Sequence, residues 1–201
     1  MKRLAALYGG SAQHHRSLHE PKYHQYFAEI IYLRDLAAHD LTAFDGLLIP
    51  ERLHAPTMRA VAPHIMDMLI RGGTVIAFGE QPDPWLPGIC WEYRPTNFWW
   101  WRDPSARSRR VAVNPAHPFF RAVPLEAATW HQHGVFLPPE GAETVIATED
   151  GAAVLYIDRV TTPGTLRVTS LDPMWHFASY FMPATERFLD KFLPWSVEEL
   201  L

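Results

Sequence analysis

Short apolar runs and amphipathic stretches alternate along the chain, which is the pattern expected of strands that alternate with helices. Residues 4–8 and 44–50 are apolar runs closed by a Gly-Gly pair and by proline, typical of buried parallel strands. Residues 57–70 carry apolar side chains at helical spacing and end at a second Gly-Gly pair, which predicts a helix. A further strand is predicted at residues 74–78, so the last three elements form a βαβ unit with a right-handed crossover.

The pattern is less regular elsewhere. We interpret the polar, histidine-rich residues 11–24 as a loop or a short helix, residues 23–31 as helical, and residues 33–36 as a short strand or linker. Three more strands and a final amphipathic helix are predicted in the second half of the chain, at residues 144–147, 153–157, 165–170 and 183–193.

Residues 80–110 interrupt the alternation with prolines and aromatic side chains, and we interpret them as a long insertion or lid. The run Trp99-Trp100-Trp101 cannot present all three rings to one side of any regular element. Trp99 and Trp100, with Arg94, are therefore candidates to stack on and bind a ligand. The alternative is a hydrophobic plug, or a docking surface for a partner subunit or a second copy, since tryptophan and arginine are enriched at interfaces.

Composition narrows the class of protein. The chain has 201 residues, 48% of them hydrophobic, which is enough for the core of one domain spanning residues 1–201. The formal net charge of −4 does not indicate a nucleic-acid partner. No apolar run approaches the roughly 20 residues that span a bilayer, and the start lacks the apolar core of a signal peptide. We therefore expect a cytoplasmic protein with no membrane partner.

Several chemistries lack their sequence motifs. The chain has no phosphate-binding loop, dinucleotide-binding turn, serine elbow or His-Glu-x-x-His zinc helix. Its single cysteine excludes an internal disulfide and a zinc site built from several cysteines. No cofactor is expected on these grounds.

Three stretches carry a family resemblance. Residues 44–50 read Phe-Asp-Gly-Leu-Leu-Ile-Pro, residues 71–79 place a Gly-Gly pair before a strand that ends in glycine, and residues 164–193 combine a strand, His176 and a helix. This order resembles the class I glutamine amidotransferase-like superfamily, and it is closest to the non-amidotransferase, trehalose-utilisation-type members. The resemblance implies a flavodoxin-like α/β fold, a parallel sheet flanked by helices.

The same resemblance implies where a catalytic triad would fall. The nucleophile would stand at Gly79 or Glu80, neither of which is a nucleophile of the right kind, and the histidine would be His176. The carboxylate that usually follows this histidine is missing, although Asp172 could approach His176 if the intervening loop bends suitably. Cys90 follows a glycine at elbow-like spacing, but we interpret it as a small buried hydrophobe. We therefore expect an amidotransferase-like domain that lacks the nucleophilic cysteine of the family.

Polar residues that follow the predicted strands suggest an acid–base site. Glu51 and His54 come after one strand, Glu80 after the next, and His176 after the last. Two carboxyl groups and two imidazoles can share acid–base work, with Glu51, Glu80 and His176 as the catalytic candidates. The alternative is that Glu51 and Arg52 form surface ion pairs and Glu80 caps a helix.

Histidines offer a second candidate site. His131 and His133 are two positions apart, so on a strand they would point the same way and contribute to ligand binding. With His176 they could form a three-histidine metal site that leaves a position open for water. The alternative is one strand face packed under a loop.

These observations predict three functions. The first is an amidotransferase-like domain that binds or hydrolyses a small polar molecule, with a carbohydrate as one candidate. The second is a non-catalytic subunit or oligomerisation module that docks through the tryptophan-rich segment. The third is a histidine-based, metal-dependent hydrolase.

Overall fold

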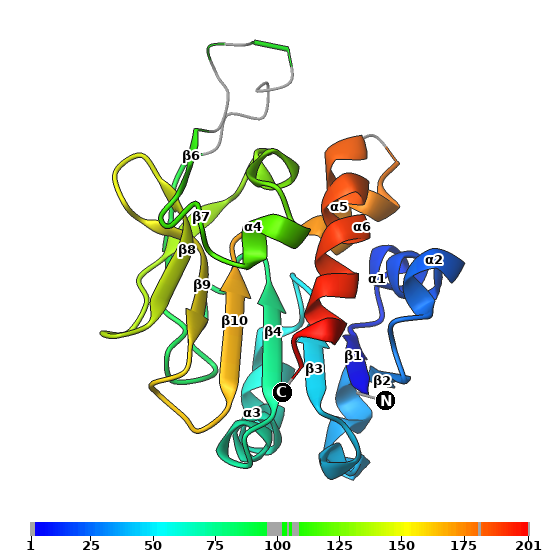
Figure 1. The fold of residues 1–201 in the computed structure, drawn as a ribbon. Helices are drawn as coiled ribbons and strands as arrows, with labels where there is room; N and C mark the ends of the chain where they lie inside the picture. The colour runs from blue at the N-terminus through cyan, green and yellow to red at the C-terminus, as the bar shows by residue number, and fades with distance from the viewer. Residues whose placement is uncertain (1–2, 96–101, 104, 106–108, 181, 201) are drawn as a thin grey trace.

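A mixed β-sheet runs through the middle of the molecule in the computed structural model, which describes residues 3–95, 102–103, 105, 109–180 and 182–200 (Figure 1). Five neighbouring strands are parallel. In spatial order they are β2 (Glu29–Tyr32), β1 (Leu4–Tyr8), β3 (Gly46–Ile49), β4 (Thr74–Phe78) and β10 (Thr165–Thr169). This is the flavodoxin-like parallel core that the sequence predicted, and the three strands expected in the second half of the chain are also present.

Antiparallel strands extend the sheet beyond β10. The strand β9 (Ala153–Asp158) pairs with β10 and then with two short branches. One branch consists of β7 (Gly134–Phe136) and β5 (Trp91–Tyr93), and the other of β8 (Glu143–Thr148) and β6 (Arg110–Ala112). The sequence predicted β8 and β9 of this extension but not β5, β6 and β7; β5 lies within the 80–110 insertion and β6 begins at its last residue.

Helices cover both faces of the sheet. They are α1 (Ala12–His19), α2 (Pro21–His24), α3 (Ala55–Ile70), α4 (Phe119–Ala122), α5 (Pro173–Ala178) and α6 (Pro183–Glu198), with 3-10 helices at Leu33–Ala38, Leu41–Ala43 and Leu125–Ala128. In Figure 1, α6 crosses in front of the parallel strands while α3 lies behind them. The described chain contains no helix that is both long and apolar enough to cross a bilayer.

Alternation along the strands divides the core between the two faces. In β4, Ile76 and Phe78 pack in the cluster that contains α6, whereas Val75 and Ala77 pack in the cluster that contains α3. All four side chains are fully buried. Strands covered on both faces read as continuous apolar runs, which is why this core was visible in the sequence.

The structure corrects two local predictions. The helix expected at residues 23–31 is absent, because α2 ends at His24 and β2 begins at Glu29. Residues 29–32 pair in parallel with β1, so main-chain pairing at the edge of the sheet overrides a weak helical spacing. Residues 33–36 lie in a 3-10 helix rather than in a strand.

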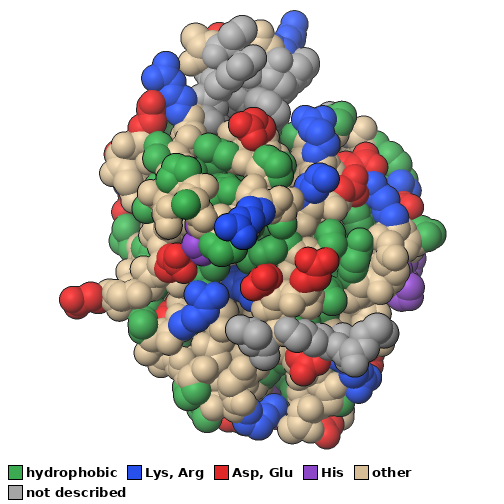
Figure 2. All heavy atoms as spheres, in the orientation of Figure 1, with side chains coloured by type: hydrophobic (Ala, Val, Ile, Leu, Met, Phe, Trp, Pro, Cys, Tyr) green, Lys and Arg blue, Asp and Glu red, His purple; other side chains and the backbone are tan. Residues whose placement is uncertain are grey.

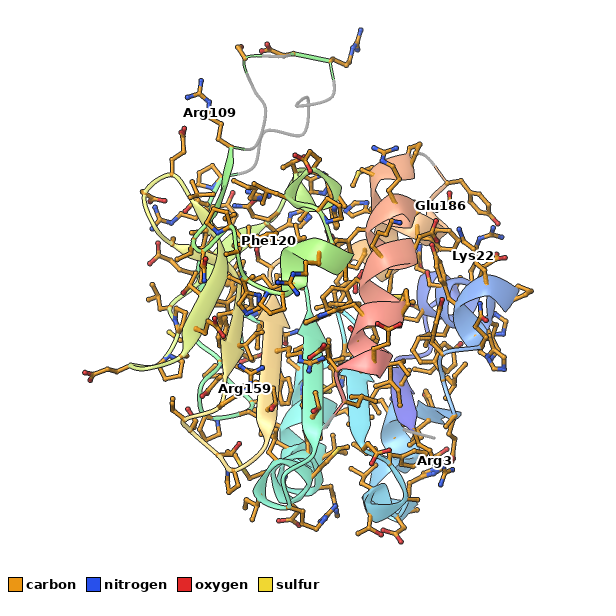
Figure 3. The ribbon with its side chains drawn as sticks, in the orientation of Figure 1. Arg3, Lys22, Arg109, Phe120, Arg159 and Glu186 are labelled. Atoms are coloured by element: carbon orange, nitrogen blue, oxygen red, sulfur yellow. The ribbon has the colours of Figure 1, made fainter. Side chains whose placement is uncertain are left out.

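Surface charges are mixed in sign. The face shown in Figure 2 carries acidic and basic side chains side by side, with apolar side chains between them. Figure 3 shows Lys22 of α2 and Glu186 of α6 pointing toward one another, and the two side chains form an ion pair. Both are partly exposed to solvent, so the pair contributes less than about 1 kcal/mol to stability.

Candidate functional site

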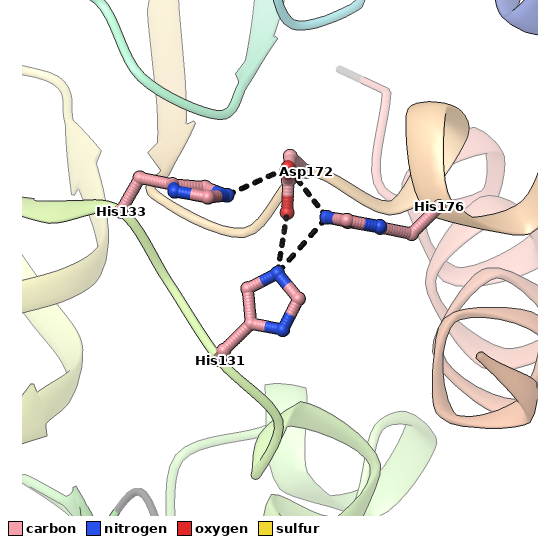
Figure 4. A group of neighbouring side chains, drawn as sticks. All are labelled: His131, His133, Asp172 and His176. Carbon is pink, nitrogen blue, oxygen red and sulfur yellow. Dashed lines mark hydrogen bonds and ion pairs between the residues drawn. The ribbon is translucent and has the colours of Figure 1, made fainter. Parts of the chain in front are cut away.

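Three imidazoles and one carboxylate meet at the carboxyl end of the parallel strands. We call His131, His133, Asp172 and His176 the His–Asp cluster, and each offers one ligand atom within 4.8 Å of all the others. Figure 4 shows the three rings converging on the carboxylate. Ligands in open α/β sheets bind at this edge.

Asp172 is the centre of the cluster. Its Oδ2 lies 3.0 Å from Nε2 of His176 and 3.3 Å from Nε2 of His133. Its Oδ1 lies 3.9 Å from Nε2 of His131, and that nitrogen is 2.9 Å from Nε2 of His176. Asp172 is fully buried, and within the described chain no donor hydrogen-bonds to its Oδ1.

Two segments position these four side chains. Asp172 follows β10 and immediately precedes α5, so His176 stands one helical turn later on the same side. His131 and His133 lie in the connection that leads into β7 rather than on a strand, and both face the same point. Buried Arg110 of β6 donates a hydrogen bond of 2.6 Å to the carbonyl oxygen of Trp130 and fixes this connection.

Electrostatics favour an anionic carboxylate among imidazoles. Burial acts to raise the pKa of Asp172, but the contacts and charges of His133 and His176 outweigh it and hold that pKa well below its usual range. Burial lowers the pKa of His131 to about 4, so its ring is neutral at pH 7 and one nitrogen carries a lone pair. The contact with Asp172 raises the pKa of His133.

Glu51 lies directly behind the cluster. It follows β3 and is fully buried, so the interpretation as a surface ion pair is wrong. Its Oε1 accepts a hydrogen bond from the backbone N–H of Trp175, in the first turn of α5. Burial raises the pKa of Glu51 to about 8, and the charge of Asp172 adds to this effect. Glu51 therefore holds α5 in place without reaching solvent.

Arg52 borders the cluster on its open side. Its guanidinium contacts Asp172 Oδ2 at 3.0 Å and His133 Nε2 at 3.3 Å, and its Nε lies 3.3 Å from Glu80 Oε1. The side chain also lies over the ring of Trp175 and remains 29% exposed. The sequence did not single out Arg52, because an arginine beside a glutamate is usually a solvated surface pair.

Gly79 occupies the turn after β4. Its φ of +73° lies in the left-handed region, and a Cβ added there would come within 2.3 Å of the Cβ of Glu51. Only glycine combines this conformation with this close approach. Its backbone N–H bonds to the carbonyl oxygens of Thr169 and Leu171, which joins β4 to the turn that carries Asp172.

The structure places the remaining predicted residues unevenly. Glu80 reaches the cluster through Arg52, whereas His54 bonds to Thr57 at the start of α3. Arg94 pairs with Glu92 and Asp150 at the far end of the sheet. Trp99 and Trp100 lie outside the described residues.

Cys90 differs from its prediction. Its side chain is exposed rather than buried, and it immediately precedes β5. The prolines of this segment hold it in an irregular connection, where no core forms over the thiol.

Comparison with known proteins identifies the fold. No protein-family model and no curated protein matches the chain. A glutamine amidotransferase from Thermotoga maritima aligns over 98% of this chain and 99% of its own, with a TM-score of 0.56 and 11% identity. A ThuA-like protein from Bacteroides uniformis aligns over 96% of this chain and 89% of its own, with a TM-score of 0.52 and 11% identity.

A third similar structure is a larger enzyme. An exo-β-1,4-mannosidase from Opitutaceae bacterium strain TAV5 aligns over 100% of this chain with a TM-score of 0.59 and 10% identity. The chain spans only 36% of the length of that enzyme. Together these similarities show an α/β fold similar to that of the glutamine amidotransferase and ThuA-like structures.

Proposed function

We propose that this amidotransferase-like domain is a metal-dependent hydrolase of a small polar molecule, with the His–Asp cluster as its metal centre. The observation that carries the proposal is the convergence of three imidazole nitrogens on one buried carboxylate. A tetrahedral metal with bonds of about 2.1 Å keeps its ligand atoms about 3.4 Å apart. Four close contacts within the cluster range from 2.9 to 3.9 Å, and all four ligand atoms lie within 4.8 Å of one another.

The donor set favours a borderline transition metal. Imidazole and carboxylate ligands suit zinc, iron, cobalt and nickel, whereas magnesium and calcium take mainly oxygen ligands. The buried Asp172 Oδ1, which no donor within the described chain satisfies, fits a cation at this position. A bound divalent metal supplies Lewis acidity and lowers the pKa of a coordinated water.

The turn after β4 supports water, rather than a side chain, as the nucleophile. By the family resemblance, the catalytic nucleophile would fall near Gly79. A Cβ added at Gly79 would collide with Glu51. In the proposed reaction, water gives its hydroxyl to the electrophilic carbon of the substrate. Its remaining proton goes to the leaving group as the carbon–leaving-group bond breaks.

A carbohydrate is one candidate substrate. One similar structure is an exo-β-1,4-mannosidase and another is a ThuA-like protein, which is the branch that the sequence resembled. Glycosides are therefore the substrates to assay first.

The test begins with metal content. Protein stripped with a chelator is dialysed against Zn²⁺, Co²⁺, Mn²⁺ or Mg²⁺, and bound metal is counted by plasma mass spectrometry. We expect about one transition-metal ion per chain, none for His176→Ala, and no change for His24→Ala, which removes an exposed histidine of α2. A wild-type protein that binds none of these metals contradicts the proposal.

Activity follows on the same samples. Chromogenic esters, amides and glycosides are assayed before and after chelation, and the proposal expects hydrolysis that disappears on chelation and returns with metal. A second candidate function, metal-free acid–base hydrolysis by His176 and Asp172, draws on their 3.0 Å contact. Hydrolysis that survives chelation but not His176→Ala favours this second candidate.

A further inference from the structure

Arg52 separates the His–Asp cluster from a small cavity, and this placement suggests what the substrate looks like. The cavity has a volume of about 120 Å³ and lies beside the start of α3; its lining includes Arg52, Leu53, Met58, Glu80 and Trp85. We propose that Arg52 binds an anionic group of the substrate, a carboxylate or a phosphate, while an apolar substituent fills this cavity. The inference rests on the proposed function for the identity of the reacting centre.

The backbone of Arg52 is held in an unusual conformation. Its φ is +59°, in the left-handed region that side chains other than glycine rarely adopt. Such strain costs on the order of 1 kcal/mol and is concentrated at functional sites. The result is a guanidinium that faces the cluster on one side and the cavity on the other.

The contacts of Arg52 would change if a cation occupied the cluster. In the structure, its Nε contacts Glu80, and its Nη2 contacts both Asp172 Oδ2 and His133 Nε2. His133 is also a candidate metal ligand, and in the proposed metal centre its lone pair would turn toward the cation. Nη2 carries two N–H groups: one would keep Asp172 Oδ2 as its acceptor, and the other would face the partly open site. A planar guanidinium in that position selects carboxylate or phosphate oxygens.

The cavity wall is mostly apolar, although the carboxyl groups of Glu80 and Asp83 also border it. The indole N–H of Trp85 donates to Oε1 of Gln81, and Nε2 of Gln81 donates to the carbonyl oxygen of Phe78. Trp85 and Met58 are buried, at 7% and 3% exposure, and present carbon atoms to the space. A volume of about 120 Å³ holds roughly four groups of the size of a water molecule. The geometry therefore suits a short alkyl substituent, and a longer chain would extend beyond the cavity.

Calorimetry with simple anions tests this arrangement on metal-loaded protein. The probes are acetate, butyrate, hexanoate, the neutral butyramide, and propylphosphonate as the phosphate-like counterpart of butyrate. We expect butyrate to bind at least tenfold more tightly than acetate or hexanoate, and butyramide not to bind. Whether butyrate or propylphosphonate binds more tightly distinguishes a carboxylate from a phosphate substrate.

Three variants locate the binding. Arg52→Met should weaken butyrate at least tenfold while the metal stoichiometry is retained, since one non-glycine residue replaces another at the same φ. Ala55→Leu, which enlarges a side chain that lines the cavity, should abolish the preference for butyrate over acetate. Arg59→Met is the matched control, because exposed Arg59 pairs with Asp83 at the cavity rim and should leave all affinities unchanged.

The outcomes separate this inference from the proposed function. If wild type and Arg52→Met bind butyrate equally tightly, or if affinity does not depend on chain length, the inference about Arg52 is overturned. The proposed metal centre is unaffected by either result. If wild type binds no metal, the proposed function fails and the same series is run on metal-free protein. If butyrate binding to metal-free protein still depends on Arg52, the role of Arg52 as the anion-binding residue is retained. If metal-free protein does not bind butyrate, that role is overturned as well.

Discussion

Nε2 of His176 lies 3.0 Å from Oδ2 of Asp172, one helical turn apart at the start of α5. The spacing of four residues places both side chains on one side of the helix, next to the end of β10. The contacts of Asp172 with His133 and His176 together hold its pKa below the usual range despite complete burial. An anionic Asp172 would neutralise part of the charge of a bound cation, in addition to supplying a fourth ligand atom.

Asp172→Asn tests that role. The substitution keeps the shape of the side chain and one oxygen but removes the negative charge, so we expect metal affinity to fall at least tenfold. Zinc affinity is measured by competition with a chelating dye. Asp150→Asn, which removes an exposed carboxylate, is the matched control and should leave zinc affinity unchanged. Wild-type affinity in Asp172→Asn contradicts a coordinating role for the carboxylate.

The sequence predicted the edge of the sheet where this site lies better than it predicted which residues converge there. Glu51, Glu80 and His176 were identified because polar residues that follow parallel strands share one edge of the sheet. Asp172 was noticed but not assigned, since its approach to His176 depends on the first turn of α5. The convergence of His131 and His133 depends on the path into β7, which buried Arg110 fixes by a long-range hydrogen bond. No local pattern encodes that contact.

Other features had no signal in the sequence. The left-handed backbone at Arg52, with a φ of +59°, is one of them, because an arginine gives no hint of this conformation. Three strands of the antiparallel extension, β5, β6 and β7, were missed because each has only three residues. Runs that short show no period that distinguishes a strand from a loop.

Glu51 leads to a second prediction, about stability. Its Oε1 accepts the N–H of Trp175, and a Gln in its place keeps an acceptor of the same shape. The pKa of Glu51 is raised to about 8, so the native carboxyl is largely neutral at pH 7. We therefore expect Glu51→Gln to keep the wild-type free energy of unfolding at pH 7. Glu51→Ala should lose about 1–3 kcal/mol by leaving a buried N–H without a partner.

Urea unfolding of metal-free protein measures both variants, so that effects on metal binding do not enter. If Glu51→Gln is as unstable as Glu51→Ala, the negative charge of Glu51 stabilises the fold rather than its hydrogen-bond acceptor. That result contradicts the prediction.

Gly79 gives a third prediction with a matched control. Gly79→Ala combines a left-handed φ with a Cβ placed 2.3 Å from the Cβ of Glu51. Gly151 has a similar φ of +87°, but a Cβ added there meets nothing within 4 Å. The control therefore isolates the backbone cost of about 1–2 kcal/mol. We expect Gly79→Ala to be less stable than Gly151→Ala by at least about 2 kcal/mol, the additional cost of overpacking.

Thermal or urea unfolding of the two variants side by side measures this difference. Equal losses of stability would mean that the turn after β4 can move away from Glu51. A nucleophile could then be accommodated at this position, and the water-based reaction would lose part of its support.

The last prediction concerns pH and rests on His14, a fully buried residue of α1. Burial lowers the pKa of His14 from 6.5 to about 4, so the folded protein keeps the ring neutral where the unfolded chain protonates it. The unfolded state then binds more protons than the folded state between these two values. The free energy of unfolding must therefore decrease as pH falls from about 6.5 to 4, and this contribution levels off below 4.

Each pH unit in that window is worth about 1.4 kcal/mol, which gives His14 an upper limit of roughly 3 kcal/mol. The check is urea unfolding of metal-free protein at pH 7, 6 and 5. His14→Gln removes the titrating ring, so its free energy of unfolding should decline less steeply than that of the wild type. His24→Gln, which alters an exposed imidazole that loses little solvent on folding, should follow the wild-type curve. Parallel curves for wild type and His14→Gln would show that the buried ring is not what makes the protein sensitive to acid.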